Sequence, residues 1–324
     1  MSQDTAVTKP ASERGRIKGV HQAVVKWIAN LSDTYYAYLL LLPTLITVGA
    51  LAVWPLINTF EISLHSNSLV GFYGDFVGFE NYVNILTGER DAVLPNPFFS
   101  LQNPLQSGLI VTFVFTFVSV VVEAFLGFGM ALVLDQKFRG RRWIRAAFII
   151  PWAFPIVIQG MIFYIMFTPG LGFATELTEW LPHLSRNALS DGPTALLVVI
   201  IADIWKQSAF VALIVLAGLQ SIDRSLYSVA EVAGATPWQQ FKLVTFPLVV
   251  PSLLIALLFR TIGAMRIYGQ IEAVTSCAVV PSLSCMVVRS FDGGAYADAA
   301  TIAFITASII GTVVSIYLIK YREV

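Results

Sequence analysis

The sequence predicts an all-α integral membrane protein with six transmembrane helices and both termini in the cytoplasm. Three observations carry this prediction. Of the 324 residues, 56% are hydrophobic and 12% are charged, about half the charged share of an average soluble domain, and the mean hydropathy is +0.75. Six apolar stretches are long enough to cross a bilayer, and Lys and Arg gather in alternate connecting segments. The formal net charge is zero, so there is no basic excess for binding nucleic acid.

The six apolar stretches define the expected membrane domain. A spanning helix needs about 20 mostly apolar residues, because its backbone polar groups must be hydrogen-bonded inside the helix. The stretches that meet this condition are residues 36–60, 107–134, 146–168, 194–218, 247–268 and 298–319. The expected order is a cytoplasmic tail (1–35), the first transmembrane helix (36–60), an extracytoplasmic loop (61–106) with a short helix around Asn81–Leu86, a core transmembrane domain (107–319) and a cytoplasmic end (320–324).

The distribution of Lys and Arg sets the expected orientation. Fourteen of these residues fall in the tail, in the loops after the second and fourth spans, and at the C-terminus. The opposite loops are longer and hold Arg90, Arg186 and Arg289. Because cytoplasmic loops retain positive charge, we expect a multi-pass protein of the cytoplasmic membrane with both termini inside, and an even number of spans agrees.

Within the tail, apolar residues recur at helical spacing among Arg16, Lys18 and Lys26. They are Ile17, Val20, Val24, Trp27, Ile28 and Leu31. This pattern predicts a short amphipathic helix at the inner membrane surface, with its apolar face in the headgroup boundary. A helix packed on the spans fits the same pattern equally well.

The loop between the fourth and fifth spans contains clear helix-end signals. Asp223 can cap a helix running to about Ala233, and Gly234 supplies the left-handed residue that ends it. The next helix has an N-cap, a proline at the first position and a capping partner at the third, which are Thr236, Pro237 and Gln239. The pattern predicts a helix, a tight glycine turn and a second helix that rises into the fifth span, where Pro247 and Pro251 should kink it.

The same loop resembles a known family. Residues 226–247 resemble the EAA loop of binding-protein-dependent ABC importer permeases, which reads roughly E-A-A-x-x-D-G-A, then an aromatic-rich stretch and Leu-Pro. The matching positions are Ala230, Gly234, Ala235, Trp238, Gln239, Phe241, Thr245 and Pro247. Ser228 and Ala233 stand where the family has its first Glu and its Asp. Glu231 lies one turn from Ser228 on the same helical face and can take over the acidic role.

Other segments extend the resemblance over most of the chain. They resemble the sugar-importer branch, the MalF- and UgpA-like permeases with a MetI-like transmembrane domain. The segments are residues 76–82, 139–141 with 151–155, 203–206, 216–222, and 260–262 with Arg266. Their order and distances along the chain make the resemblance specific.

The resemblance implies the permease subunit of an ATP-driven importer for a sugar or sugar derivative, working by alternating access. Such a subunit is not an enzyme and binds no cofactor, because ATP and Mg belong to two separate ATP-binding subunits. The other implied partners are a second homologous permease, an extracytoplasmic solute-binding protein and the lipid bilayer. The chain agrees in having no G-x-x-x-x-G-K-S/T phosphate loop. Its two Cys and three scattered His provide no set of ligands for a metal.

The resemblance also implies where the ATPase subunits dock. We refer to residues 221–246 as the coupling segment, of which residues 223–241 form a helical elbow. The residues expected to couple to the ATPases are Ser228, Ala230, Glu231, Gly234, Ala235, Trp238 and Phe241.

Four charged residues fall inside the expected spans, where each costs about 2.5–3.5 kcal/mol and therefore needs a reason. They are Glu123, Asp203, Lys206 and Arg260. Asp203 and Lys206 are three residues apart, so on one helix they are expected to neutralise each other as a buried pair. Arg260 is expected to bind a carboxylate such as Glu123 or Asp203, while Glu123 can instead face the partner permease.

Uncharged polar and aromatic side chains in the spans suit a sugar, because they hydrogen-bond hydroxyl groups and stack on sugar rings. With the resemblance, the candidate substrate-pathway residues are Gln159, Gln207, Phe210, Thr261, Arg266 and Tyr268. Ordinary helix packing explains each of them equally well. Phe259 and Gly263 stand where the family has polar residues, which predicts a sparse site or one shared with the partner permease.

Cys277 and Cys285 fall in the expected outer loop 269–297. A disulfide is chemically allowed there and would stiffen the loop that meets a solute-binding protein, whereas two free thiols are the alternative.

Two other classes of function compete. An ion-gradient-driven secondary transporter would use Asp203 and Glu123 as proton or ion sites, but it leaves the coupling segment without a role. An integral membrane enzyme is disfavoured, because no cluster of His, Asp and Ser is placed for chemistry on either face.

Overall fold

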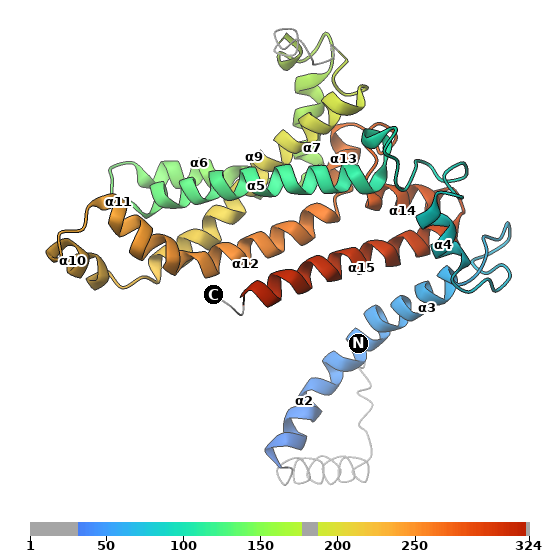
Figure 1. Ribbon diagram of the computed structural model, residues 1–324, viewed down its shortest axis with the longest axis horizontal. Helices are drawn as coiled ribbons and strands as arrows, with labels where there is room; N and C mark the ends of the chain where they lie inside the picture. The colour runs from blue at the N-terminus through green and yellow to red at the C-terminus, as the bar shows by residue number, and fades with distance from the viewer. Residues whose placement is uncertain (1–31, 177–186, 322–324) are drawn as a thin grey trace, which may run out of the picture. The chain divides into compact units, whose positions relative to one another are not determined.

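The computed structural model describes residues 32–176 and 187–321. Their secondary structure is helical, apart from one isolated bridge between His65 and Phe76 (Figure 1). The chain divides into two compact units, Met1–Thr59 and Phe60–Val324. Among the described residues, five helices are long and apolar enough to cross a membrane, and the number is six if a bent helix pair counts as one span. The amphipathic helix expected in the tail falls outside the described residues.

The first unit contains the first expected span. α2 (Asp33–Val48), a π-helical turn η1 (Gly49–Val53) and α3 (Trp54–Ser63) follow one another without a break over 31 residues. The π turn lies just before Pro55. A proline has no N–H and its ring needs room in a helix, which the wider π turn provides. This helix covers the predicted span 36–60.

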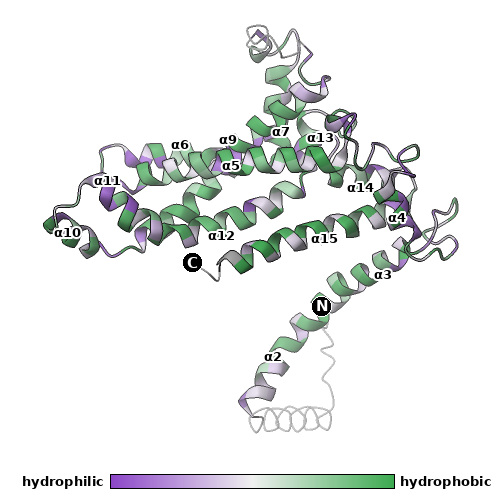
Figure 2. Cartoon of the chain, viewed as in Figure 1, coloured by the Kyte–Doolittle hydropathy of each residue, from purple (hydrophilic) through white to green (hydrophobic). Residues whose placement is uncertain are grey.

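The second unit is built on four long helices that run side by side (Figure 1). They are α5 (Gly108–Asp135), α9 (Gly192–Gln220), α12 (Phe246–Met265) and α15 (Tyr296–Tyr321). α5 packs closely on α9 because Gly127 has no side chain: a Cβ there would lie 2.6 Å from the Val211 Cβ. Figure 2 shows apolar residues along these helices and polar residues near α11 and α4 at the two ends of the unit.

The third predicted span, 146–168, is wrong as a single helix. The structure has α6 (Arg141–Ala153) and α7 (Ile156–Phe167), which are bent by 95° relative to each other. Pro155 explains the break, because a proline pushes the residue before it out of the helical region, and Phe154 has ψ 134°. α7 then packs on the short helix α13 (Gly269–Val274).

The expected kink at the start of the fifth span takes another form. α11 (Pro237–Gln240), the π turn η3 (Phe241–Thr245) and α12 make one continuous helix of 29 residues. The Phe246 N–H bonds to the carbonyl of Phe241, so the helix widens just before Pro247 instead of bending sharply.

The segment between the first and second spans forms its own small structure at one end of the second unit. It contains α4 (Glu80–Thr87), which confirms the short helix expected around Asn81–Leu86, and the 3₁₀ turn η2 (Pro104–Gln106). Tyr82 on α4 shares a hydrogen bond of 2.7 Å with Ser63, and burial raises the pKa of this tyrosine. Asp298 at the start of α15 accepts a hydrogen bond from Asn67 at 2.7 Å, which ties the segment to α15.

Candidate transport pathway and coupling segment

A buried cluster of charges joins three of the long helices. Arg260 on α12 donates to both carboxylate oxygens of Glu123 on α5, at 2.5 and 3.0 Å, and to Asp203 on α9 at 2.8 Å. The three residues are 5%, 0% and 4% exposed. The planar guanidinium group offers several donors in fixed directions, so it can bind both carboxylates at once. The expected bond between Arg260 and a carboxylate is confirmed, and it involves both candidates.

This cluster corrects the expected pairing of Asp203 with Lys206. Asp203 binds Arg260, and the Lys206 ammonium instead donates to the carbonyl of Phe154, in the break between α6 and α7. Spacing along one helix predicted the Lys206 pair, but the Arg260 guanidinium, from a neighbouring helix, makes the charge-assisted bond to Asp203.

Three of the six candidate pathway residues lie on α7 and α9. Gln159 is fully buried and donates to the carbonyl of Ala202 at 2.5 Å, so it links α7 to α9. Gln207 is half-buried. Phe210 is also half-buried and stacks on Trp152, with ring centroids 6.4 Å apart.

The other three lie at the end of α12. Thr261 is buried, bonds to the carbonyl of Leu257 and shares a hydrogen bond of 3.1 Å with Tyr317 on α15. It lines an apolar groove of about 460 Å³ along α5, α12 and α15. Arg266 is exposed and Tyr268 is half-buried. The structure thus places Gln159 in a helix contact, Thr261 in a groove and the other four at half-buried or exposed positions. The role of all six in substrate binding stays a prediction.

The coupling segment has the local geometry expected from its sequence. α10 (Ser225–Val232) is followed by Gly234 with φ 81°, and α11 begins with a capping box between Thr236 and Gln239. The Ser225 N–H donates to the Asp223 carboxylate at 2.9 Å, and this hydrogen bond lowers the pKa of Asp223.

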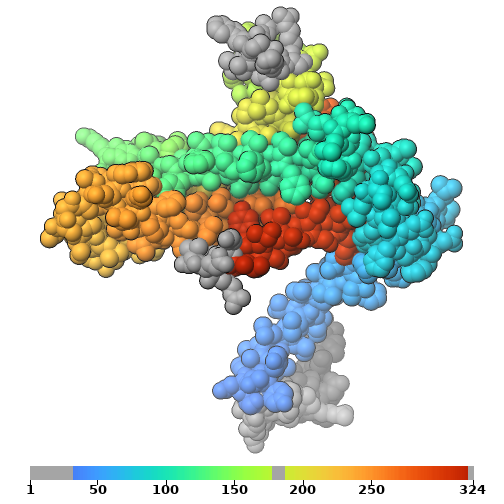
Figure 3. All heavy atoms as spheres, viewed as in Figure 1, coloured from blue at the N-terminus to red at the C-terminus, as the bar shows by residue number. Residues whose placement is uncertain are grey.

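One side-chain contact joins this segment to α5, and another joins its two halves. Arg224 donates to both carboxylate oxygens of Asp135, at the end of α5, at 2.9 Å each. Tyr227 on α10 shares a hydrogen bond of 3.0 Å with Thr245, just before α12. Figure 3 shows the segment at one end of the second unit and residues 61–106 at the other. Sequence reasoning missed the ion pair, since 89 residues separate Asp135 from Arg224 and only the fold brings them together.

The outer face of the segment is apolar and exposed. Val229, Val232 and Trp238 are 67%, 91% and 69% exposed. Of the seven predicted coupling residues, four are exposed (Ser228, Glu231, Gly234 and Trp238) and three are half-buried (Ala230, Ala235 and Phe241). Exposed apolar side chains on a fastened segment are typical of a surface that another protein covers.

The Asp135–Arg224 pair predicts a measurable effect on this segment. Asp135→Asn should cost at most about 1 kcal/mol in the free energy of unfolding, because Arg224 is 63% exposed and water screens the pair. Amide hydrogen exchange over α10, followed by mass spectrometry, should nevertheless become faster. Glu89→Gln, at the other end of the unit, is the matched control. Unchanged exchange over α10 in Asp135→Asn would show that the pair does not fasten the segment.

Two further features bear on the predicted sites. Within the described ranges, no group of three or more His, Cys, Asp or Glu residues is arranged to hold a metal ion. Cys277 and Cys285 are joined by a disulfide, with their Cα atoms 5.4 Å apart.

Comparison with known proteins gives consistent results. Residues 123–322 match the family described as "Binding-protein-dependent transport system inner membrane component". The chain is 32% identical to the trehalose/maltose transport system permease protein MalF of Thermococcus litoralis, over 87% of this chain and 92% of that protein. It is 31% identical to the trehalose transport system permease protein SugA of Mycobacterium tuberculosis, over 76% and 75% of the two chains.

A solved structure supports the fold. A bacterial alginate ABC transporter, in complex with an alginate pentasaccharide-bound periplasmic protein, contains a chain that aligns with a TM-score of 0.68. The alignment covers 87% of this chain and 92% of that one at 20% identity, so it is evidence for the fold alone. The family match covers more than half of the sequence, and two permeases are over 30% identical to this chain across alignments that cover 87% and 76% of it. The chain therefore belongs to the family of binding-protein-dependent transport system inner membrane components.

Proposed function

We propose that this chain is the transmembrane permease subunit of an ATP-driven importer for a sugar or sugar derivative, with both termini in the cytoplasm. Two ATPase subunits bind ATP and Mg and dock on the coupling segment. A second homologous permease completes the pathway through the membrane, and a solute-binding protein delivers the substrate at the opposite end of the chain.

The coupling segment is the observation that carries this proposal. Arg224 binds Asp135 at the end of α5, and Tyr227 ties α10 to Thr245 in the turn before α12, yet the segment exposes Val229, Val232 and Trp238. A segment that is bonded to the rest of the fold and exposes apolar side chains is suited to bind a soluble partner and to move with it.

The fold offers a route for such a movement. α11, η3 and α12 are one continuous helix, so a displacement of the coupling segment is carried along α12. Arg260 then links α12 to Glu123 on α5 and Asp203 on α9. These three helices therefore move together, which suits the rigid-body rocking of alternating access.

The substrate class follows from the relatives. Permeases named for trehalose and maltose match most of the chain, and a permease of Agrobacterium fabrum named for sulfoquinovosyl glycerol is 34% identical over 75% of it. Gln207 and Phe210 lie three residues apart on α9, and both are half-buried. An amide and an aromatic ring on neighbouring turns can bind a hydroxyl group and a sugar face.

The ion-gradient alternative is disfavoured by the charge cluster. A coupling-ion site needs a carboxylate that can exchange its partner during transport. Glu123 and Asp203 are both buried and both bound to Arg260. Each is therefore occupied by an internal counter-charge.

Reconstitution tests the proposal. Proteoliposomes should contain this chain, the second permease and the ATPase subunits, with the solute-binding protein and its bound solute outside. We expect uptake that requires hydrolysable ATP in the ATPase compartment and that ionophores leave unchanged. Vesicles without the ATPase subunits are the control. Uptake in those vesicles, or its collapse when an ionophore is added, would favour the ion-gradient transporter instead.

A further inference from the structure

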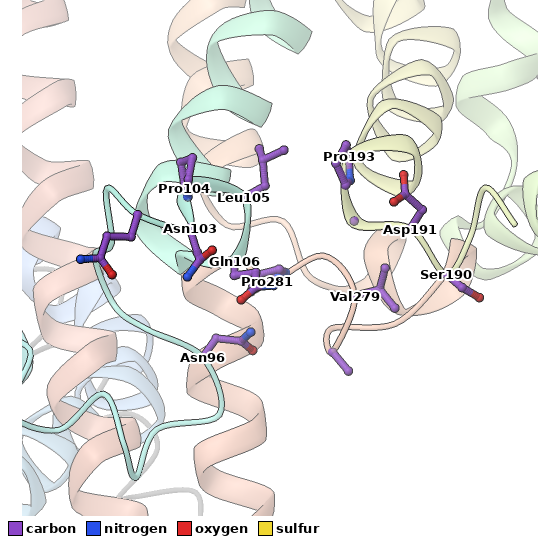
Figure 4. A pocket seen from close by; sticks show the side chains of 13 residues that line it. Asn96, Asn103, Pro104, Leu105, Gln106, Ser190, Asp191, Pro193, Val279 and Pro281 are labelled. Atoms are coloured by element: carbon purple, nitrogen blue, oxygen red, sulfur yellow. The ribbon is translucent and has the colours of Figure 1, made fainter. Parts of the chain in front are cut away.

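A pocket of about 640 Å³ with a mixed polar and apolar lining lies at the end of the second unit opposite the coupling segment. Three separate parts of the chain line it: the segment before α5, the start of α9 and the loop closed by the Cys277–Cys285 disulfide. Figure 4 shows Asn103 and Gln106 on one side and Ser190 and Asp191 on the other, with Val279 and Pro281 between them. The volume lies in the range of about 300–1,000 Å³ that is usual for small-molecule sites.

Four of the thirteen residues that line the pocket carry side-chain amides. They are Asn96, Gln102, Asn103 and Gln106. A side-chain amide both donates and accepts hydrogen bonds, and so does a hydroxyl group, which makes several amides around one pocket suited to a polyhydroxylated ligand. In the described part of the chain, the side chains of Asn103 and Gln106 have no hydrogen-bond partner and are exposed. They are available to a ligand.

The pocket is held in shape by contacts behind its surface. Asp191 accepts from the backbone and the hydroxyl of Thr194, at 3.1 and 2.5 Å, which caps α9 and fixes the carboxylate. Asn96 accepts from Arg289 at 2.9 Å, which orients its amide. Ala278, Val279 and Pro281 line the third wall inside the disulfide-closed loop. Polar groups that are positioned before a ligand arrives lose less entropy on binding.

We propose that this pocket is a receiving site for the polyhydroxylated substrate, separate from the polar residues within the membrane. The inference rests on the proposed function, because it takes this end of the chain to face the outside. A sugar released there meets the amides of Asn103 and Gln106 before it enters the membrane. The solute-binding protein of the proposed importer would dock around this pocket, and the pocket itself has the size of a site for one small molecule.

The test measures sugar binding to the assembled permease complex, with both permeases and the ATPase subunits in nanodiscs and without the solute-binding protein. Saturation-transfer NMR with maltose and with trehalose gives the Kd of each probe. We expect the double variant Asn103→Leu/Gln106→Leu to weaken binding of at least one probe about tenfold, which corresponds to about 1.4 kcal/mol.

Gln136→Leu is the matched control, because Gln106 and Gln136 are exposed glutamines that flank the two ends of α5. It should leave the Kd unchanged. Gln207→Leu tests the residues within the membrane. An unchanged Kd in the double variant, with weaker binding in Gln207→Leu, would overturn the receiving site, as would failure of both sugars to bind the unmodified complex. ATP-dependent uptake by the unmodified complex separates the two proposals: if it is present, only the pocket assignment fails.

Discussion

Replacing Gly234 by valine should lower ATP hydrolysis stimulated by the loaded binding protein about tenfold or more, while the chain still inserts in the membrane. Gly234 has φ 81°, a backbone conformation that a β-branched residue adopts only at a cost of about 1–3 kcal/mol. An added Cβ would contact nothing within 4 Å, so backbone strain and not steric clash is the cause. A free-energy cost of that size changes the ratio of two conformations roughly 5–150-fold. We expect the substitution to change the angle between α10 and α11.

Gly140→Val provides the matched control for this experiment. Gly140 has φ 92°, also has open space around its Cβ position, and lies just before α6, outside the coupling segment. It should impose similar strain without uncoupling ATP hydrolysis. Both variants need comparable amounts of assembled complex, checked by size-exclusion chromatography. Equal loss of stimulated hydrolysis in the two variants, or normal hydrolysis in Gly234→Val, would contradict the role assigned to the segment.

Replacing Arg260 by methionine should destabilise the chain by about 3–5 kcal/mol, because it leaves the carboxylates of Glu123 and Asp203 buried without a counter-charge. Thermal unfolding of the purified complex, followed by intrinsic tryptophan fluorescence, measures the effect. The same change at Arg266, near the end of the same helix, is the matched control. Arg266 is exposed, so Arg266→Met should shift the unfolding midpoint little.

A triple variant separates the charge imbalance from the packing of this site. Glu123→Leu, Asp203→Leu and Arg260→Met together remove all three charges, and replacing a complete buried ion cluster by apolar residues is often neutral or stabilising. We therefore expect the triple variant to recover most of the stability lost in Arg260→Met. If it unfolds at the same temperature as the single variant, the carboxylates are not the reason for the loss.

Features that depend on neighbouring residues follow from the sequence. The apolar stretches predict the long helices of the second unit to within a few residues, because burial of backbone groups in lipid demands long, uninterrupted helices. The capping box at Thr236 and the left-handed Gly234 are likewise local, since each involves atoms only a few residues apart. The disulfide between Cys277 and Cys285, eight residues apart in one loop, needed the folded geometry to bring the two Cα atoms to 5.4 Å.

Features that depend on which helices meet were decided by the tertiary structure. Periodicity could place Asp203 and Lys206 on one helix face, but Arg260 is 57 residues from Asp203 and 137 from Glu123, and it reaches both only after α5, α9 and α12 pack together. The amide pocket before α5 likewise involves segments distant in sequence. Helix propensity and residue spacing reflect interactions between residues that are close in the sequence. The partner of a buried charge and the shape of a pocket depend instead on which distant residues the fold brings together.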